Sequence, residues 1–239
     1  MSKWKLYIIS TMLLLALGFL YGFAQHQNKQ EKLQGIEVTF EENQPLFLTE
    51  SMVNKLLIQS ESNLLSKPKS EINLYNIEID IKKNKMMESA EVFYAPSGKL
   101  QVKVVQRVPI ARIQTSRNSY YLDRNGFAMP LSTKYTARVP LVTGVNTKET
   151  EKECFILIQK IVNDSFYKKQ IIGIHRKLNG DYLLSTRIGN HKVLLGKSNN
   201  IEVKMKNLKV FYKKEWGTET LKKYKLINLK YDSQVVCST

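Results

Sequence analysis

Cysteine, glycine and proline are scarce in this sequence of 239 residues. Two cysteines are too few for a small domain held together by disulfides, and 11 glycines and 6 prolines exclude a collagen-like or low-complexity chain. With 43% hydrophobic and 24% charged residues, the chain is also not a disordered polyelectrolyte. The length therefore predicts one or two folded domains, of which two is the better expectation. We expect Cys154 to be buried and Cys237 to be exposed, and whether the two pair stays open.

Residues that mark a metal or phosphate site are also few. The three histidines stand far apart, without cysteine or histidine at ligand spacings, so we predict no metal and no cofactor. They are His26, His175 and His191. No glycine-rich phosphate loop is present in the sequence.

Besides one at 2–5 on the predicted cytoplasmic side, two Ser-x-x-Lys motifs, at 66–69 and 165–168, have the spacing that places a lysine amine one helical turn from a nucleophilic serine. Pro68 would interrupt a helix within the first motif, and neither S-D-N nor K-T-G accompanies the pair. An anchored extracytoplasmic hydrolase is therefore the disfavoured alternative, and we predict that the chain is not an enzyme.

The clearest signal is a run of 19 residues without a charge, at 6–24. As a helix rising ~1.5 Å per residue it would extend about 29 Å, close to the ~30 Å thickness of the hydrocarbon core of a bilayer. Lys3 and Lys5 precede the run, and uncharged polar residues follow it. The positive-inside rule then predicts that residues 1–5 are cytoplasmic, that 6–24 span the inner membrane once, and that the rest lies outside, after a linker at 25–34.

The alternative is a cleaved signal peptide, because Gly22-Phe23-Ala24 resembles a cleavage site. The uncharged run is longer than the ~7 to 15 residues of a typical signal peptide core, which favours a retained anchor. The formal charge of +16 points to an anionic partner. Because the bulk of the chain is predicted to lie outside the cytoplasm, in the periplasm or its equivalent, we predict no nucleic-acid partner.

Residues 35–107 contain signals for five elements in the order strand, helix, helix, strand, strand. Apolar and polar residues alternate at 36–40, Thr49 precedes an apolar stripe of helical period, and 73–85 repeat that period. A hairpin is predicted at 92–104, with Gly98 in its turn. A small sheet covered by two helices is the layout of a POTRA module.

Residues 108–239 are predicted to form a β-rich domain with flanking helices, so the chain as a whole is α+β. Asp123, before Asn125-Gly126, is interpreted as a turn acceptor, and Arg107 as a residue that fixes the passage between the domains. A meander is expected at 171–195. The remaining expected strands are 111–114, 120–123, 129–131, 139–142 and 225–236, and the expected helices are 148–160 and 199–215.

In this order, and behind one membrane helix, these pieces resemble the FtsQ/DivIB family of bacterial cell-division proteins. The resemblance rests on MMESAEVFYAPSGKLQVKVV at 86–105, RVPIA at 107–111, YLDRNG at 121–126, VPLVTG at 139–144 and INLKYDSQVV at 227–236. It implies a bitopic scaffold of the divisome, located at the division site, that binds FtsB/FtsL-like partners outside the cytoplasm and helps to assemble the septal machinery. Other division proteins are implied to contact the membrane helix or the POTRA-like domain.

In the family, the last strand of the β domain binds the FtsB-like partner by strand addition. Carried onto this chain, the resemblance nominates Lys230, Tyr231 and Ser233 as contact residues, and Gln234 beside them, where relatives often carry a small residue. Independently, an edge strand leaves unpaired N–H and C=O groups, and Lys230 would point outward to a partner carboxylate. Alternatively, Tyr231 packs in the core and lysines blunt the edge. A different POTRA-containing envelope assembly protein is the alternative function, although the sequence shows one copy of the module and no barrel strands.

Overall fold

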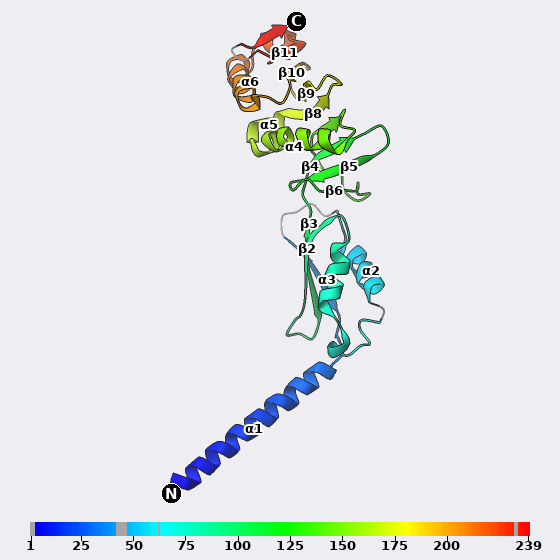
Figure 1. Ribbon diagram of the computed structural model, residues 1–239, viewed down its shortest axis with the longest axis vertical. Coiled ribbons are helices and arrows are strands. Elements are labelled where there is room, and N and C mark those ends of the chain that lie inside the picture. Colours follow the sequence, from blue (N-terminus) through cyan, green and yellow to red (C-terminus); the bar gives the residue numbers. More distant parts are fainter. Residues whose placement is uncertain (1–2, 42–46, 62, 232–233) are drawn as a thin grey trace. The chain divides into compact units, whose positions relative to one another are not determined.

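The computed structural model describes residues 3–41, 47–61, 63–231 and 234–239, and it consists of two compact units (Figure 1). The first unit ends at Gln106 and the second begins at Arg107. Each unit combines helices with a β-sheet, which confirms the predicted α+β class.

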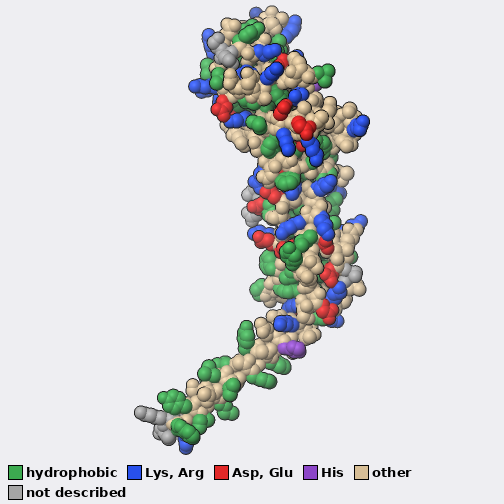
Figure 2. All heavy atoms as spheres, viewed as in Figure 1, with side chains coloured by type: hydrophobic (Ala, Val, Ile, Leu, Met, Phe, Trp, Pro, Cys, Tyr) green, Lys and Arg blue, Asp and Glu red, His purple; other side chains and the backbone are tan. Residues whose placement is uncertain are grey.

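Helix α1 (Lys3–Gln30) begins the first unit and contains the predicted membrane segment. It is long and apolar enough to cross a membrane, and its large apolar side chains are exposed (Figure 2). Leu15 and Phe19, for example, are 75% and 73% exposed. An apolar surface of this extent is stable only in a nonaqueous surrounding, which a bilayer supplies.

The helix continues beyond the predicted membrane segment, so the predicted linker at 25–34 is helical as far as Gln30. Residues 25–30 include neither glycine nor proline, and hence nothing interrupts the backbone hydrogen bonds of the helix. Lys29 stands in the last turn, where a positive charge interacts favourably with the helix dipole.

The rest of the first unit has the predicted order of strand, helix, helix, strand and strand, with a short 3-10 helix between the α-helices. The elements are β1 (Ile36–Phe40), α2 (Glu50–Ser60), η1 (Lys69–Glu71), α3 (Leu74–Lys82), β2 (Met87–Tyr94) and β3 (Leu100–Gln106). Strand β3 is central, with β1 parallel to it and β2 antiparallel. Gly98 has a φ of 76°, as its predicted place in the turn between β2 and β3 requires.

Local signals account for the two α-helices of this unit. The side chains of Thr49 and Asn73 cap α2 and α3 by accepting hydrogen bonds from the backbone N–H of Met52 and Asn76. The buried faces of both helices share one core with the sheet. That core includes Val53, Leu57, Ile77, Ile81, Leu100, Val102 and Val104.

In the described residues, the second unit contains one sheet of nine strands. They are β4 (Pro109–Gln114), β5 (Ser119–Asp123), β6 (Ala128–Met129), β7 (Leu141–Thr143), β8 (Ile171–Arg176), β9 (Tyr182–Thr186), β10 (Lys192–Gly196), β11 (Leu226–Asn228) and β12 (Val236–Ser238). Their order across the sheet is β12-β11-β10-β9-β8-β7-β4-β5-β6. Strands β8, β9 and β10 form the predicted meander, whereas β7 lies between β4 and β8 and is parallel to both, which the sequence did not predict.

Helices α4 (Lys148–Asn163) and α6 (Ile201–Glu215) confirm the two predicted helices of the second unit. Helices α5 (Ser165–Gln170) and α7 (Glu219–Lys223) were missed because they are too short to show a helical period. The apolar faces of α4 and α6 share a core with the sheet, and Cys154 is buried there, as predicted.

A buried carboxylate holds the chain where the second unit begins. Asp123 is fully buried, and its Oδ1 accepts hydrogen bonds from the backbone N–H of Asn125 at 2.9 Å and of Phe127 at 2.7 Å. Its Oδ2 pairs with the Arg107 guanidinium at 2.7 Å. These contacts confirm Asp123 as a turn acceptor and show that Arg107 is fixed by this turn.

The junction of β7 with the following loop depends on a glycine. Gly144 has a φ of +79°, and a Cβ at this position would lie 1.9 Å from the backbone carbonyl oxygen of Arg176. We expect Gly144→Ala to lower the free energy of unfolding by roughly 3 kcal/mol or more, because left-handed strain and a backbone clash add together. Gly217 is a matched control, since its φ is +80° and its Cβ position is open.

Gly217→Ala is expected to cost only the left-handed strain, ~1 to 2 kcal/mol. Urea denaturation followed by circular dichroism measures both variants. Equal losses in the two would contradict the clash at Arg176.

Candidate partner-binding edge

The sheet of the second unit ends in a C-terminal hairpin, the region in which the sequence nominated partner-binding residues. Strand β11 pairs in parallel with β10, and β12 pairs antiparallel with β11, so β12 is the outermost strand on this side. The prediction of one continuous strand at 225–236 is wrong, because β11 ends at Asn228 and a separate strand, β12, begins at Val236 and pairs antiparallel with it.

Contacts at the end of β11 explain why the chain turns there. Oδ1 of Asn228 accepts a hydrogen bond from the backbone N–H of Lys230 at 3.0 Å, the arrangement of an Asx turn. Leu229 is buried, and its backbone N–H donates to the carbonyl of Leu194 at 2.8 Å. Apolar residues alternate in the sequence as far as Tyr231, but the hydrogen bonds to β10 end at Leu229.

The nominated residues that the structure describes consequently lie between the two strands, not on the edge strand. Lys230, Tyr231 and Gln234 are exposed there, whereas Ser233 lies outside the described residues. Tyr231 is 53% exposed, so the alternative in which its ring packs in the core is wrong. Loop residues beside an edge can add side-chain contacts, but the ladder hydrogen bonds of strand addition come from the strand itself.

Lys230 has a carboxylate partner within the chain. Its ammonium lies 3.1 Å from Oδ2 of Asp181, whose side chain is 6% exposed. The hydrogen bond from Lys230, reinforced by one from Asn179, holds the pKa of the Asp181 carboxyl below its usual range. The sequence predicts that Lys230 pairs with a carboxylate of a partner. In the structure it pairs instead with Asp181, which directly precedes β9.

The backbone groups on the outer side of β12 are those that a further strand would use. The carbonyl of Lys225 accepts a hydrogen bond from the N–H of Lys192 in β10, and the N–H of Leu229 donates to the carbonyl of Leu194 in β10. Every second residue along β11 and its flanks therefore faces β10. The intervening residues 226 and 228 face β12 and lie opposite its last and first residues. The middle residue of β12, Cys237, therefore directs its backbone N–H and C=O away from β11.

Sequence reasoning missed most of this edge strand, because the predicted strand stopped at Val236. A signal was present: Asp232 and Ser233 are turn-forming residues inside the apolar alternation. A turn placed at this pair would have divided the run into two strands and put Cys237 on the outer one.

A metal site and a Ser66–Lys69 pair have no support among the residues that the structure describes. Groups of three or more metal-ligating side chains are absent from that part of the chain. Lys69, the candidate base for Ser66, donates hydrogen bonds to Glu31 at 2.9 Å and Asn28 at 3.0 Å. Burial raises the pKa of Cys154 to about 12, so its thiol is protonated near neutral pH.

Two family models match the chain, one in each unit. The model described as "POTRA-like domain" matches residues 33–105. The model described as "FtsQ/DivIB, C-terminal related" matches residues 108–238, which is more than half of the chain. The chain belongs to the FtsQ/DivIB family.

A curated protein from Salinibacter ruber (strain DSM 13855 / M31), named "Cell division protein FtsQ", is 28% identical to this FtsQ/DivIB-family chain over 156 residues. The alignment covers 59% of the chain and 60% of the relative, so the chain spans less than two thirds of the relative's length. The family assignment confirms the resemblance read from the sequence. Strand β12 lies inside the residues that the FtsQ/DivIB family model matches.

The ion pair between Lys230 and Asp181 predicts a pH-dependent stability. Lys230→Met keeps the side-chain stem and removes the charge, so we expect it to lower the free energy of unfolding at pH 7 by ~0.5 to 1 kcal/mol. The pKa of Asp181 is lowered in the folded chain, so its contribution is present above the ordinary value of ~3.9 and is lost as pH falls through the folded pKa.

Urea denaturation at several pH values between 7 and 2 should therefore show a deficit of Lys230→Met that shrinks as the pH falls below ~4. Lys192→Met is the control, because the Lys192 ammonium donates to the Ser185 hydroxyl and not to a carboxylate. A deficit of the same size in both variants, or one that persists when Asp181 is protonated, would argue against the ion pair.

Proposed function

We propose that this chain is a membrane-anchored scaffold of the divisome that binds FtsB/FtsL-like proteins outside the cytoplasm. The observation that carries the proposal is the position of β12 as the outermost strand of the sheet, within the residues that match the FtsQ/DivIB family. The partner's strand would add to this edge, and the complex would help to assemble the septal machinery. No catalytic step is part of the proposal.

Strand addition at β12 follows from its unshared backbone groups. A partner strand would exchange hydrogen bonds with Cys237, whose N–H and C=O point outward, and would thereby extend the sheet by one strand. The side chains of Val236 and Ser238 are exposed and would meet the partner's side chains, whereas Cys237 packs partly against the core. Backbone bonds would supply affinity and the exposed side chains specificity.

The loop at 229–235 would provide a second set of contacts beside the same edge. Tyr231 and Gln234 are exposed on it, and the ion pair of Lys230 with Asp181 fixes the loop's first residues. An exposed tyrosine offers a large apolar face and a hydroxyl while it loses little side-chain entropy on binding. The nominated residues thus keep a role as side-chain contacts, with Lys230 as a positioning residue.

The anchor would be helix α1. Its exposed apolar surface supports a single crossing of the cytoplasmic membrane, and Lys3 and Lys5 at its N-terminal side support a cytoplasmic N-terminus. Both folded units would then lie outside the cytoplasm.

Proline at the centre of β12 tests strand addition. Cys237→Pro removes the outward N–H, while the hydrogen bonds that join β12 to β11 belong to the neighbouring residues. We expect binding of the purified FtsB/FtsL-like ectodomains to weaken at least tenfold, with little change in the unfolding temperature. Isothermal titration calorimetry on the full chain in detergent measures the affinity.

Cys237→Val is the matched control, because valine favours strands and keeps the backbone N–H. It should bind its partners as the unchanged chain does. Proline and valine variants that bind equally well would exclude the β12 backbone as the site of addition, and a Tyr231→Ala variant would then show whether the loop alone binds.

The proposed topology has its own test. Mass spectrometry of the membrane-extracted protein should find residues before Gln25, and protease added to spheroplasts should digest both folded units while leaving an N-terminal membrane fragment. A mature chain that begins at Gln25 would contradict the anchor and would support a cleaved signal peptide.

A further inference from the structure

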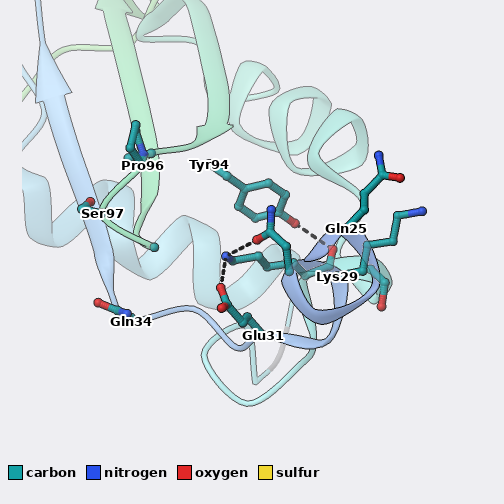
Figure 3. A pocket seen from close by; sticks show the side chains of 12 residues that line it. Gln25, Lys29, Glu31, Gln34, Tyr94, Pro96 and Ser97 are labelled. Atoms are coloured by element: carbon teal, nitrogen blue, oxygen red, sulfur yellow. Dashed lines mark hydrogen bonds and ion pairs between the residues drawn. The ribbon is translucent and has the colours of Figure 1, made fainter. Parts of the chain in front are cut away.

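A cavity of about 920 Å³ lies in the first unit, where the end of α1 meets η1 and the turn between β2 and β3. This volume falls in the range of ~300 to 1,000 Å³ that is typical of small-molecule sites. In Figure 3, Gln25 and Lys29 of α1 lie on one side of the view, Gln34, Pro96 and Ser97 lie on the other, and Tyr94 stands between them. No part of the proposed partner-binding edge contributes to this cavity.

The part of α1 that lines the cavity lies just outside the apolar run. Ala24 is the last residue of that run, and α1 continues for six residues, or about 9 Å, to Gln30. The headgroup layer of a bilayer adds ~5 to 7 Å on each side of its hydrocarbon core. Gln25, Asn28 and Lys29, which line the cavity, therefore fall at headgroup depth when α1 spans the membrane.

Hydrogen bonds fasten this end of α1 to the folded unit. The Lys69 ammonium, whose side chain is 11% exposed, donates to Glu31 at 2.9 Å and to Asn28 at 3.0 Å. The backbone N–H of Lys69 donates to the carbonyl of Glu31 at 3.0 Å, and Gln34 donates to the carbonyl of Gly98 at 3.0 Å. The cavity is thus bounded by groups held in place, which lowers the cost of ordering them around a ligand.

The lining is rich in donors that suit a phosphate group. Lys29 is exposed, and it has no ion pair within the described part of the chain, whereas Glu31 neutralises the charge of Lys69. Hydroxyls of Ser70 and Ser97 and side-chain amides complete the polar lining. Lys29 is therefore the cation that decides whether an anion binds here.

Tyr94 adds an aromatic wall of the kind found at membrane interfaces. Its hydroxyl donates to the carbonyl of Lys69 at 2.9 Å, which fixes the ring beside the end of α1 (Figure 3). Tyrosine rings are enriched at headgroup level because one end is apolar and the other is polar. Polar donors, one unpaired cation and an interfacial ring in a cavity at this depth match the chemistry of a phospholipid headgroup.

We propose that this cavity binds the phosphodiester headgroup of one membrane phospholipid, with the Lys29 ammonium paired to the phosphate. The inference rests on the proposed anchoring of α1 in the membrane and is independent of strand addition at β12. Binding would fix the first folded unit at the membrane surface, because Asn28 and Lys69, which also line the cavity, join α1 to η1.

Native mass spectrometry of the full chain tests this site. The chain would be reconstituted in nanodiscs of phosphatidylglycerol and phosphatidylethanolamine in equal parts, transferred to detergent and examined for retained lipid. We expect the unchanged chain to retain one phospholipid and Lys29→Glu to retain it about tenfold less, as expected for the loss of one charge-assisted hydrogen bond. Lys55→Glu, an equal change of charge on the exposed side of α2, should retain the lipid.

A second variant tests the cavity without changing its charge. Ser97 is exposed on the turn between β2 and β3, so Ser97→Trp should fill part of the volume without unfolding the unit, and it should also reduce lipid retention. An excess of inorganic phosphate in the detergent should not displace the lipid if the headgroup is recognised as part of a phospholipid. Displacement would show that the cavity is a site for free phosphate and would overturn the lipid assignment.

The outcomes separate this inference from the anchoring on which it rests. A chain that does not enter nanodiscs would contradict the anchor, and the cavity would then lose its headgroup depth. A chain that enters nanodiscs and retains lipid equally in the unchanged, Lys29→Glu and Lys55→Glu forms would overturn the headgroup site alone.

Discussion

The exposed apolar surface of α1 is the constraint on which the rest of the molecule depends. Its large apolar side chains are exposed, and solvating them with water is costly, whereas a bilayer would surround them with apolar groups. If α1 spans the membrane as proposed, the end of the helix lies at headgroup depth. The six polar residues that follow the apolar run would then connect the membrane segment to the folded protein, and the Lys69 side chain bonds to Asn28 and Glu31 at this connection.

In each folded unit, a buried polar side chain accepts hydrogen bonds from backbone N–H groups that lie outside the helices and strands. In the first unit, Oε1 of Gln106 accepts hydrogen bonds from the N–H groups of Phe47 and Leu48 at 2.9 and 3.0 Å. In the second unit, Oδ1 of Asp123 accepts hydrogen bonds from the N–H groups of Asn125 and Phe127. Leaving such buried donors unpaired would cost ~1 to 3 kcal/mol each. Each unit thus has its own core and its own buried polar side chain that satisfies irregular backbone.

At the proposed partner-binding edge, affinity and specificity would come from different parts of one hairpin. Any extended segment could pair with the backbone groups of β12. The strand has only three residues, however, and a short edge strand limits nonspecific strand pairing. The neighbouring loop carries Tyr231 and Gln234, and its geometry is set by the Asx turn of Asn228 and the ion pair of Lys230. A partner would have to pair with the β12 backbone and also fit the loop side chains, which would exclude strands that match only one of the two.

Some of these features were determined by the sequence alone. These features depend on signals within a few residues of each other. They are the membrane segment, the capped helices α2 and α3, the hairpin at Gly98 and the turn at Asp123. The place of β7, the end of strand pairing at Leu229 and the internal partner of Lys230 were decided only by the tertiary structure. The physical reason is distance along the chain: periodicity and capping act over about four residues. Strand neighbours and ion pairs such as Lys230 with Asp181 instead depend on which distant segments the common core brings together.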